Sequence, residues 1–267
     1  MTEPQLKETP LLHSLAIQVR VIGALLMREI LTRYGRHNLG FLWLFIEPML
    51  FTLGVTALWT ATKAAHGSAL PIAAFAVTGY SSVLLWRNTV MRCNCAILPN
   101  LSLMYHRNVR VIDVFVSRII LEIAGATISF ITLTIFFVAI DLMVLPSDIL
   151  KVIFGWILLA WFGAALALVI GSLSEFSELI EKIWHPISYL LFPLSGAAFM
   201  LDWLPTSARQ IISWLPMVHG VEILREGYFG QLVHAHYDIS YMSVVCLCLT
   251  FIGLALVREV GYRVEPQ

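Results

Sequence analysis

Long apolar runs separated by short polar segments dominate this chain. A helix crosses a bilayer with about 20 apolar residues, and six runs are long enough, at residues 41–62, 64–86, 112–140, 152–174, 183–201 and 239–257. Lipid offers no partner to a free backbone group, and the runs lack the alternation of barrel strands, so each run is predicted to be a helix. The pattern therefore predicts an all-α membrane protein with six transmembrane helices in a single domain, 1–267.

The composition supports a membrane location. Apolar side chains make up 59% of the 267 residues and charged ones 13%, whereas a soluble domain has about 45–50% and about 25%. Lys plus Arg and Asp plus Glu number 17 each, so no net positive charge favours nucleic acid as a partner. The first residues lack the basic and apolar regions of a removable signal peptide.

The basic residues predict the orientation of the spans, because they concentrate in cytoplasmic connections. Thirteen of the 17 lysines and arginines fall at the two ends of the chain and in the connections on the same side as these ends. The opposite side holds only Lys63, Lys151, Arg209 and Arg225. This asymmetry predicts that both termini lie in the cytoplasm.

Two patterns of small residues concern packing. Gly163, Ala167 and Gly171 repeat at four-residue spacing, which predicts a stripe where another helix approaches closely. The spacing fits a contact within the subunit or across a dimer equally well. The four cysteines form two pairs with i,i+2 spacing, unlike a C-x-x-C metal site, and are interpreted as reduced packing residues.

Residues 15–36 predict a helix that lies in the cytoplasmic interface. Arg28, Thr32 and Arg36 stack at i,i+4 spacing, and apolar residues line other faces. The uncharged centre is too short to cross, so the basic edge is expected to face lipid headgroups. A solvated helix of a small cytosolic domain is the alternative.

The connection from residue 87 to 118 is long for a link between neighbouring helices. Asn100, after Pro99, can cap a short helix there, which would dock a partner protein or merely continue the second span. Residues 202–238, on the outer side, are too apolar for a free loop. They predict two short re-entrant helices, about 207–214 and 218–228, forming a lid, or else a surface loop without a transport role.

The sequence offers no signs of intrinsic catalysis. No lysine follows a glycine, so the phosphate-binding G-x-x-x-x-G-K-[ST] loop is absent. G-x-S-x-G and H-E-x-x-H are absent as well, and His234 with His236 is weak evidence for a metal. We therefore expect neither an enzyme nor a metal site.

An ion-coupled carrier would place several ionisable groups within the spans, but only Glu47 and Glu122 come close. Glu122 follows Arg118 by four residues and is interpreted as a surface ion pair with it. Glu47 precedes Pro48, whose bend is a possible cytoplasmic gate or a passive kink.

Several motifs resemble a known family. REILTRY at 28–34, LGFLW at 39–43 and Glu47-Pro48 resemble the N-terminal signature of ABC-2-type polysaccharide export permeases. Three further features are more similar to the capsule polysaccharide branch of Gram-negative bacteria: Trp59 with Lys63, GYSSVLLWRN at 79–88, and PNLSLMYHRN at 99–108. The resemblance covers essentially the whole chain.

This resemblance implies a permease subunit of an ATP-driven exporter that moves lipid-linked acidic capsular polysaccharide across the bacterial inner membrane. It implies a second copy of the chain and two separate ATP-binding cassette subunits, which use ATP and Mg, while this chain binds no cofactor. A periplasmic polysaccharide co-polymerase adaptor and an outer-membrane export channel would receive the polymer. Alternatives are an ABC-2 permease for O-antigen, teichoic acid or another lipid-linked glycan, and a membrane enzyme acting on polyprenyl-linked sugars, for which Asp202 and Glu222 are candidates.

The resemblance also implies site residues, grouped here by role. The family's coupling helix corresponds to residues 95–108, with ATPase contacts at Pro99, Asn100, Leu103, Tyr105, His106, Arg107 and Asn108. Aromatic faces cover sugar rings while polar groups match hydroxyls and acidic groups, which favours a substrate path of Trp43, Glu47, Trp59, Tyr80, Trp86, Arg87 and Asn88. Guanidinium groups suit a lipid phosphate, expected at Arg33, Tyr34 and Arg36. A periplasmic gate is expected at Asp202, Trp203, Trp214, His219, Glu222 and Arg225.

Overall fold

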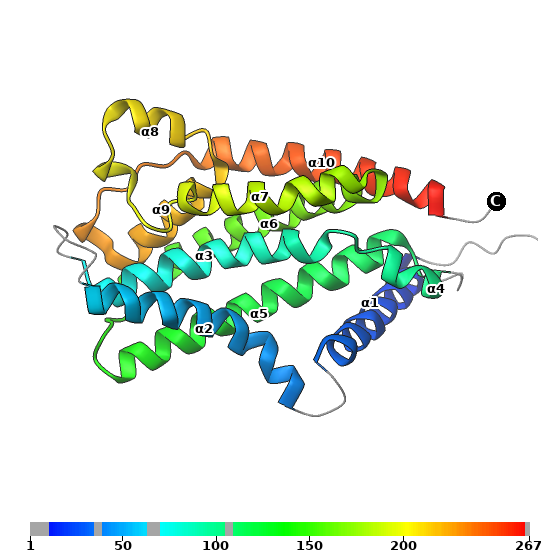
Figure 1. The fold of residues 1–267 in the computed structure, drawn as a ribbon, viewed down its shortest axis with the longest axis horizontal. Helices are drawn as coiled ribbons and strands as arrows, with labels where there is room; N and C mark the ends of the chain where they lie inside the picture. The colour runs from blue at the N-terminus through cyan, green and yellow to red at the C-terminus, as the bar shows by residue number, and fades with distance from the viewer. Residues whose placement is uncertain (1–10, 35–38, 63–69, 105–108, 265–267) are drawn as a thin grey trace, which may run out of the picture.

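The computed structural model describes residues 11–34, 39–62, 70–104 and 109–264. Within these ranges the chain is helical and has no strand. Most helices lie along the long axis of the molecule (Figure 1). Their bounds are α1 Leu11–Tyr34, α2 Leu39–Thr62, α3 Ile72–Cys93, α4 Leu101–Met104, α5 Val111–Ala139, α6 Ile149–Phe176, α7 Glu178–Leu194, α8 Thr206–Ile212, α9 Pro216–Phe229 and α10 Ile239–Val264. Short 3₁₀ turns are η1 Leu98–Asn100, η2 Leu201–Trp203 and η3 Gly230–Leu232.

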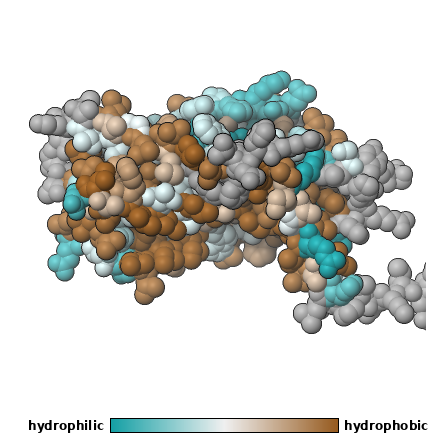
Figure 2. Space-filling view, turned by 90° about the horizontal axis from the view of Figure 1, so that it is seen from below, coloured by the Kyte–Doolittle hydropathy of each residue, from teal (hydrophilic) through white to brown (hydrophobic). Residues whose placement is uncertain are grey.

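The structure confirms an all-helical chain with helices able to cross a membrane. In the described ranges, α5, α6 and α10 are each long and apolar enough to cross, and α2 contains a shorter apolar stretch, Ile46–Thr60. Hydrophobic residues cover most of the face seen in Figure 2. The number of six spans stays a prediction, because α3 and α7 are not among the helices that are long and apolar enough to cross.

Two helices differ most from the predicted apolar runs. α3 continues to Cys93, past Arg87 and Arg92, because charged side chains do not interrupt a helix whose other faces are packed. α7 begins at Glu178, where Ser177 caps it, and ends at Leu194. Gly196 has a φ of +84° just beyond this end, a conformation that glycine adopts without strain.

The molecule has two distinct ends. Figure 1 places α4 and the last turn of α10 at one end, called the α4 end, and α8 and α9 at the other, called the α8 end. The helix α1 lies at the α4 end, oblique to the bundle, and packs against α2 and α5. The segment predicted to re-enter the membrane therefore lies far from the helix predicted to lie in the interface.

The helix α6 forms the centre of the bundle and packs against α3, α9 and α10. Its predicted small-residue stripe makes close contacts. A Cβ on Gly163 would lie 2.8 Å from the Cα of Trp86, and one on Gly171 would lie 2.8 Å from the carbonyl oxygen of Cys93. The predicted close approach is confirmed, and for these two glycines it is made within one chain, to α3.

Candidate functional site

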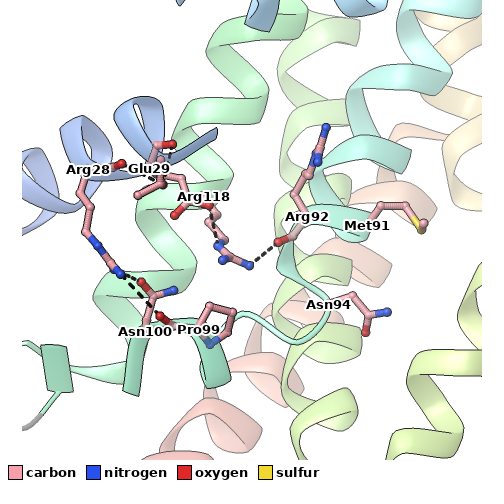
Figure 3. A pocket seen from close by; sticks show the side chains of 9 residues that line it. Arg28, Glu29, Met91, Arg92, Asn94, Pro99, Asn100 and Arg118 are labelled. Atoms are coloured by element: carbon pink, nitrogen blue, oxygen red, sulfur yellow. Dashed lines mark hydrogen bonds and ion pairs between the residues drawn. The ribbon is translucent and has the colours of Figure 1, made fainter. Parts of the chain in front are cut away.

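A polar pocket of about 470 Å³ opens at the α4 end. Its walls come from α1, α3, α5 and the connection between α3 and α5, residues 94–110 (Figure 3). The lining residues are Arg28, Glu29, Thr32, Met91, Arg92, Asn94, Pro99, Asn100 and Arg118. Segments far apart in the sequence therefore meet here.

On one side of the pocket, α1 holds the α3–α5 connection. The Arg28 guanidinium donates a hydrogen bond to Asn100 Oδ1, and a second to the carbonyl oxygen of Pro99 at 3.5 Å. Asn100 is buried, and its amide donates to the carbonyl oxygen of Ala96 at 2.8 Å. The turn η1 is thus fixed from within and from α1.

On the other side, an ion pair joins α1 to α5. Arg118 Nε lies 3.2 Å from Glu29 Oε1, and both side chains are nearly buried, at 11% and 12% exposed. Arg118 also donates to the carbonyl oxygen of Arg92 at 2.8 Å. Because both charges are nearly buried, removing one partner of such a pair is expected to cost about 3–5 kcal/mol.

Arg92 connects two further helices. Its guanidinium lies 3.7 Å from the buried Glu122 carboxylate of α5 and 3.3 Å from Glu47 of α2. The predicted surface position of Glu122 and Arg118 is wrong, because both are buried, and both make ion pairs with other helices, Glu122 with Arg92 and Arg118 with Glu29. Glu47, predicted in the substrate path, is about half exposed and pairs with Arg92. Pro48 lies inside α2, which is bent in Figure 1.

Some of the predicted site residues lie outside the part of the chain that the structure describes. Arg36, Tyr105, His106, Arg107 and Asn108 fall outside the described residues, and the side chains of Arg33, Tyr34 and Leu103 are not described. Their predicted roles at the lipid phosphate and at the ATPase stay predictions. Pro99 and Asn100 line the pocket, as described above.

A chain of aromatic contacts runs from α7 through α3 to the turn η2 and is called the aromatic track. Its members are Phe51 and Trp59 of α2, Phe75 and Tyr80 of α3, Phe192 of α7 and Trp203 of η2, together with Tyr189 of α7, which is linked to Phe192 through the Arg87 guanidinium. Ring centroids of Phe192 and Tyr80 are 5.4 Å apart, and so are those of Tyr80 and Trp59. Phe75 stacks on Trp203 at 5.1 Å.

One end of the track carries a positive charge. The Arg87 guanidinium of α3 lies 4.5 Å from the ring centroid of Tyr189, a cation–π contact. Tyr189 is 64% exposed and Phe51 45%, whereas Phe75 and Tyr80 are buried, so ring surface is exposed at part of the track. Such a surface can stack on apolar faces of sugar rings and attract acidic groups.

The track contains some of the predicted path residues and lacks others. Trp59 and Tyr80 belong to it, and Arg87 contacts its rings Tyr189 and Phe192. Trp86 is fully buried against Phe162 of α6, while Trp43 is exposed on α2. No contact joins Asn88 to the track among the interactions of the described residues. The sequence analysis missed Phe51, Phe75, Tyr189 and Phe192, for which the only signal was an aromatic residue on an apolar run.

At the α8 end, two buried charged residues of α9 hold backbone groups. Arg225 is fully buried and donates to the carbonyl oxygens of Gly196, Ala197 and Phe199, each at 2.6 Å. Its guanidinium also stacks 3.7 Å from the ring centroid of Phe75. We call this set of contacts the Arg225 clamp. It fixes the turn after α7 against α3 and α9.

Glu222 holds two other segments. Its carboxylate accepts hydrogen bonds from the backbone N–H of Leu201 at 2.9 Å and of His236 at 3.0 Å. His219, also buried, accepts one from the N–H of Asp238 at 2.9 Å through Nδ1. Three predicted gate residues, Glu222, Arg225 and His219, thus act on backbone.

The other predicted gate residues are more exposed. His236 Nε2 lies 3.0 Å from Asp202 Oδ1, and Arg209 lies 3.6 Å from the same oxygen. The hydrogen bond from His236 lowers the pKa of Asp202. Trp203 belongs to the aromatic track, and Trp214 is 75% exposed. In the described part of the chain, no group of three His, Cys, Asp or Glu residues is arranged to hold a metal ion.

Comparison with known families matches residues 20–229 to the ABC-2 type transporter family. The chain is 46% identical over 262 residues to the capsule polysaccharide export inner-membrane protein CtrC of Neisseria meningitidis serogroup B, which covers 98% of this chain and 99% of that protein. It is 44% identical over 260 residues to the capsule polysaccharide export inner-membrane protein BexB of Haemophilus influenzae, covering 97% and 98%. It is 26% identical over 249 residues to the polysialic acid transport protein KpsM of Escherichia coli, covering 91% and 94%.

Proposed function

Because this chain belongs to the ABC-2 type transporter family, we propose that it is the permease subunit of an ATP-driven exporter of lipid-linked capsular polysaccharide. The observation that carries the proposal is the likeness to CtrC and BexB over nearly the full length of both chains. The chain is a transport protein of the inner membrane and works without catalysis of its own.

In this proposal, α2, α3, α5, α6, α7 and α10 cross the membrane. The α4 end and both termini face the cytoplasm, and the α8 end faces the periplasm. Support comes from the distribution of basic residues and from the position of α1, oblique to the bundle at the α4 end. α1 then lies in the cytoplasmic interface, where Arg33, Tyr34 and Arg36 meet the lipid phosphate of the substrate.

The glycan passes along the aromatic track. Its exposed rings, Phe51, Tyr189 and Trp203, need a second wall, and a second copy of the chain supplies it. Arg87 at the cytoplasmic side receives acidic sugars, and stacking on successive rings lets the polymer slide without a single tight site. The segment containing α8 and α9 forms the periplasmic gate, beyond which an adaptor and an outer-membrane channel receive the polymer.

The energy comes from partners. Two ATP-binding cassette subunits, which bind ATP and Mg, dock at the α4 end and contact the α3–α5 connection from Pro99 onward. When they close, the connection moves and pulls on α1, α3 and α5 through the contacts of Arg28 and Arg118. This order of events fits a chain that lacks its own phosphate-binding loop.

The proposal is tested by deleting the gene in its native host. We expect surface capsule to disappear, lipopolysaccharide ladders to stay unchanged, and complementation to restore capsule. A partner ATPase whose phosphate-binding lysine is replaced should give the same loss. Altered ladders with intact capsule would favour O-antigen export instead. Turnover of a polyprenyl-linked sugar by the purified chain without an ATPase would contradict the exporter.

The track gives a prediction of its own. Replacing Tyr189 by alanine removes an exposed ring beside Arg87, and we expect export to fall about fivefold, as loss of ~1 kcal/mol of stacking would cause. Tyr189→Phe keeps the ring and should export normally. Tyr262→Ala, exposed on α10 outside the track, is the matched control. Capsule is measured by immunoassay at equal permease levels; normal export by Tyr189→Ala would exclude this ring from the path.

A further inference from the structure

The helices α6 and α7 meet in an abrupt turn at the α4 end. α6 ends at Phe176 and α7 begins at Glu178, so Ser177 alone joins them. Ser177 is extended, with φ −153°, and its hydroxyl accepts a hydrogen bond from the N–H of Leu179 at 3.3 Å. Residues 174–177 are called the elbow. Because a single residue separates the two helices, a displacement of the elbow is expected to move α7 as well.

The start of the α3–α5 connection is bonded to this elbow. The N–H of Cys95 donates to Ser174 Oγ at 3.0 Å, and the N–H of Ile97 donates to Glu175 Oε1 at 2.8 Å. Cys95 has a φ of +48°, the left-handed region that costs free energy for a residue other than glycine. The sharp bend there is thus maintained by its surroundings, and Ile97 beyond it is buried.

Glu175 is an unexpected residue for its position. It lies in the last turn of α6, where the negative end of the helix dipole disfavours a carboxylate by about 0.3–1 kcal/mol. Helix capping gives no reason for an acid here, since the backbone at this helix end needs donors. The carboxylate is instead used as an acceptor for another segment, the α3–α5 connection.

The α3–α5 connection is therefore held at two points. Arg28 of α1 is hydrogen-bonded to Pro99 and Asn100. Glu175 of α6 accepts a hydrogen bond from Ile97. The elbow continues into α7, which carries Tyr189 and Phe192 of the aromatic track. A physical connection thus runs from the predicted ATPase-docking segment to the track.

We propose that Glu175 is a positioning residue that ties the α3–α5 connection to the elbow, so that movement imposed by the ATPase reaches α7 and the aromatic track. This inference rests on the proposed function. It assigns to the elbow a transmission role separate from that of α1. Without the Glu175 contact, the ATPase still docks and hydrolyses ATP, but α7 no longer follows.

The test uses the permease with its ATPase in proteoliposomes, measuring ATP hydrolysis and glycan export together. For Glu175→Ala we expect hydrolysis at the wild-type rate and export reduced about tenfold, because the acceptor is lost. Glu175→Gln keeps a carbonyl oxygen for the Ile97 N–H and should restore export. Glu178→Ala, three residues on and exposed in a surface pair with Lys182, is the matched control and should behave as wild type.

The other possible results of this experiment would each overturn the inference. Equal loss of hydrolysis and export in Glu175→Ala, with lowered thermal stability, would mean that Glu175 only stabilises the fold, and would overturn the inference. Unchanged export would overturn it as well, while the wild-type control still supports the proposed function. If wild-type vesicles show no ATP-dependent export, the proposed function fails and the inference falls with it.

A second variant tests the inference if Glu175→Ala does not fold. Ser174→Ala removes the neighbouring hydrogen bond to Cys95 and is expected to lower export per ATP by about threefold. An unchanged ratio of export to hydrolysis in Ser174→Ala would then overturn the inference. Thermal unfolding in detergent, measured for each variant, separates a loss of transmission from a loss of folded protein.

Discussion

Replacing Arg225 by methionine is expected to abolish export and to lower the yield of folded permease. The guanidinium is fully buried and satisfies the carbonyl oxygens of Gly196, Ala197 and Phe199. An apolar side chain would leave these oxygens without donors in an environment with little water, at about 1–3 kcal/mol for each. The sum is comparable with the whole stability of many proteins.

The measurement is the midpoint of thermal unfolding in detergent, with capsule export as the second readout. Arg225→Lys keeps the charge but presents one compact ammonium in place of a planar fork, so we expect an intermediate loss. Arg258→Met, exposed on α10 beside Tyr262, should unfold as wild type does. A stable, exporting Arg225→Met variant would refute the clamp.

The second large effect is expected at Arg118. Arg118→Met removes a close ion-pair partner from the nearly buried Glu29 carboxylate, and we expect a destabilisation of about 3–5 kcal/mol with loss of export. Glu29→Gln in the same chain removes the buried carboxylate charge and should recover part of the stability, so the two changes are not additive. Chemical unfolding of the four members of this cycle provides the measurement.

A surface ion pair is the control for this cycle. Lys182→Met breaks the pair with Glu178, whose side chains are 70% and 85% exposed, and such pairs contribute little in water. We expect an unfolding curve close to that of the wild type. Additive effects of the Arg118 and Glu29 changes would show that the two side chains do not interact in the folded protein.

Local patterns predicted much of the fold because they concern neighbours along one helix. The spacing of Gly163 and Gly171 indicated a close helix contact, and the structure supplies the partner, Trp86 and Cys93 of α3. The apolar runs indicated helices, although the limits of α3 and α7 moved with packing and with Gly196. An apolar run in the sequence does not indicate which distant residue a charged side chain will contact.

The candidate site was less predictable because its contacts join distant segments. Arg118 and Glu122 have suitable spacing for a pair on one helix, yet α1 and α3 offer better partners, Glu29 and Arg92. In the aromatic track, Tyr80 and Phe192 lie on different helices, and nothing in either segment alone marks them as neighbours. The residue types indicated which kinds of contact to expect, but only the fold showed which residues make them.

The Arg225 clamp has a consequence for biogenesis. Its acceptors lie in the turn that follows α7, and this turn packs against Gly79 of α3, where a Cβ would collide with the Ala197 carbonyl oxygen and the guanidinium. The arginine has no comparable shelter in a nascent chain, and lipid solvates a lone cation poorly. We therefore expect α9 to take its final position only after α3 and α7 have associated, so that this segment would be one of the last parts of the bundle to mature.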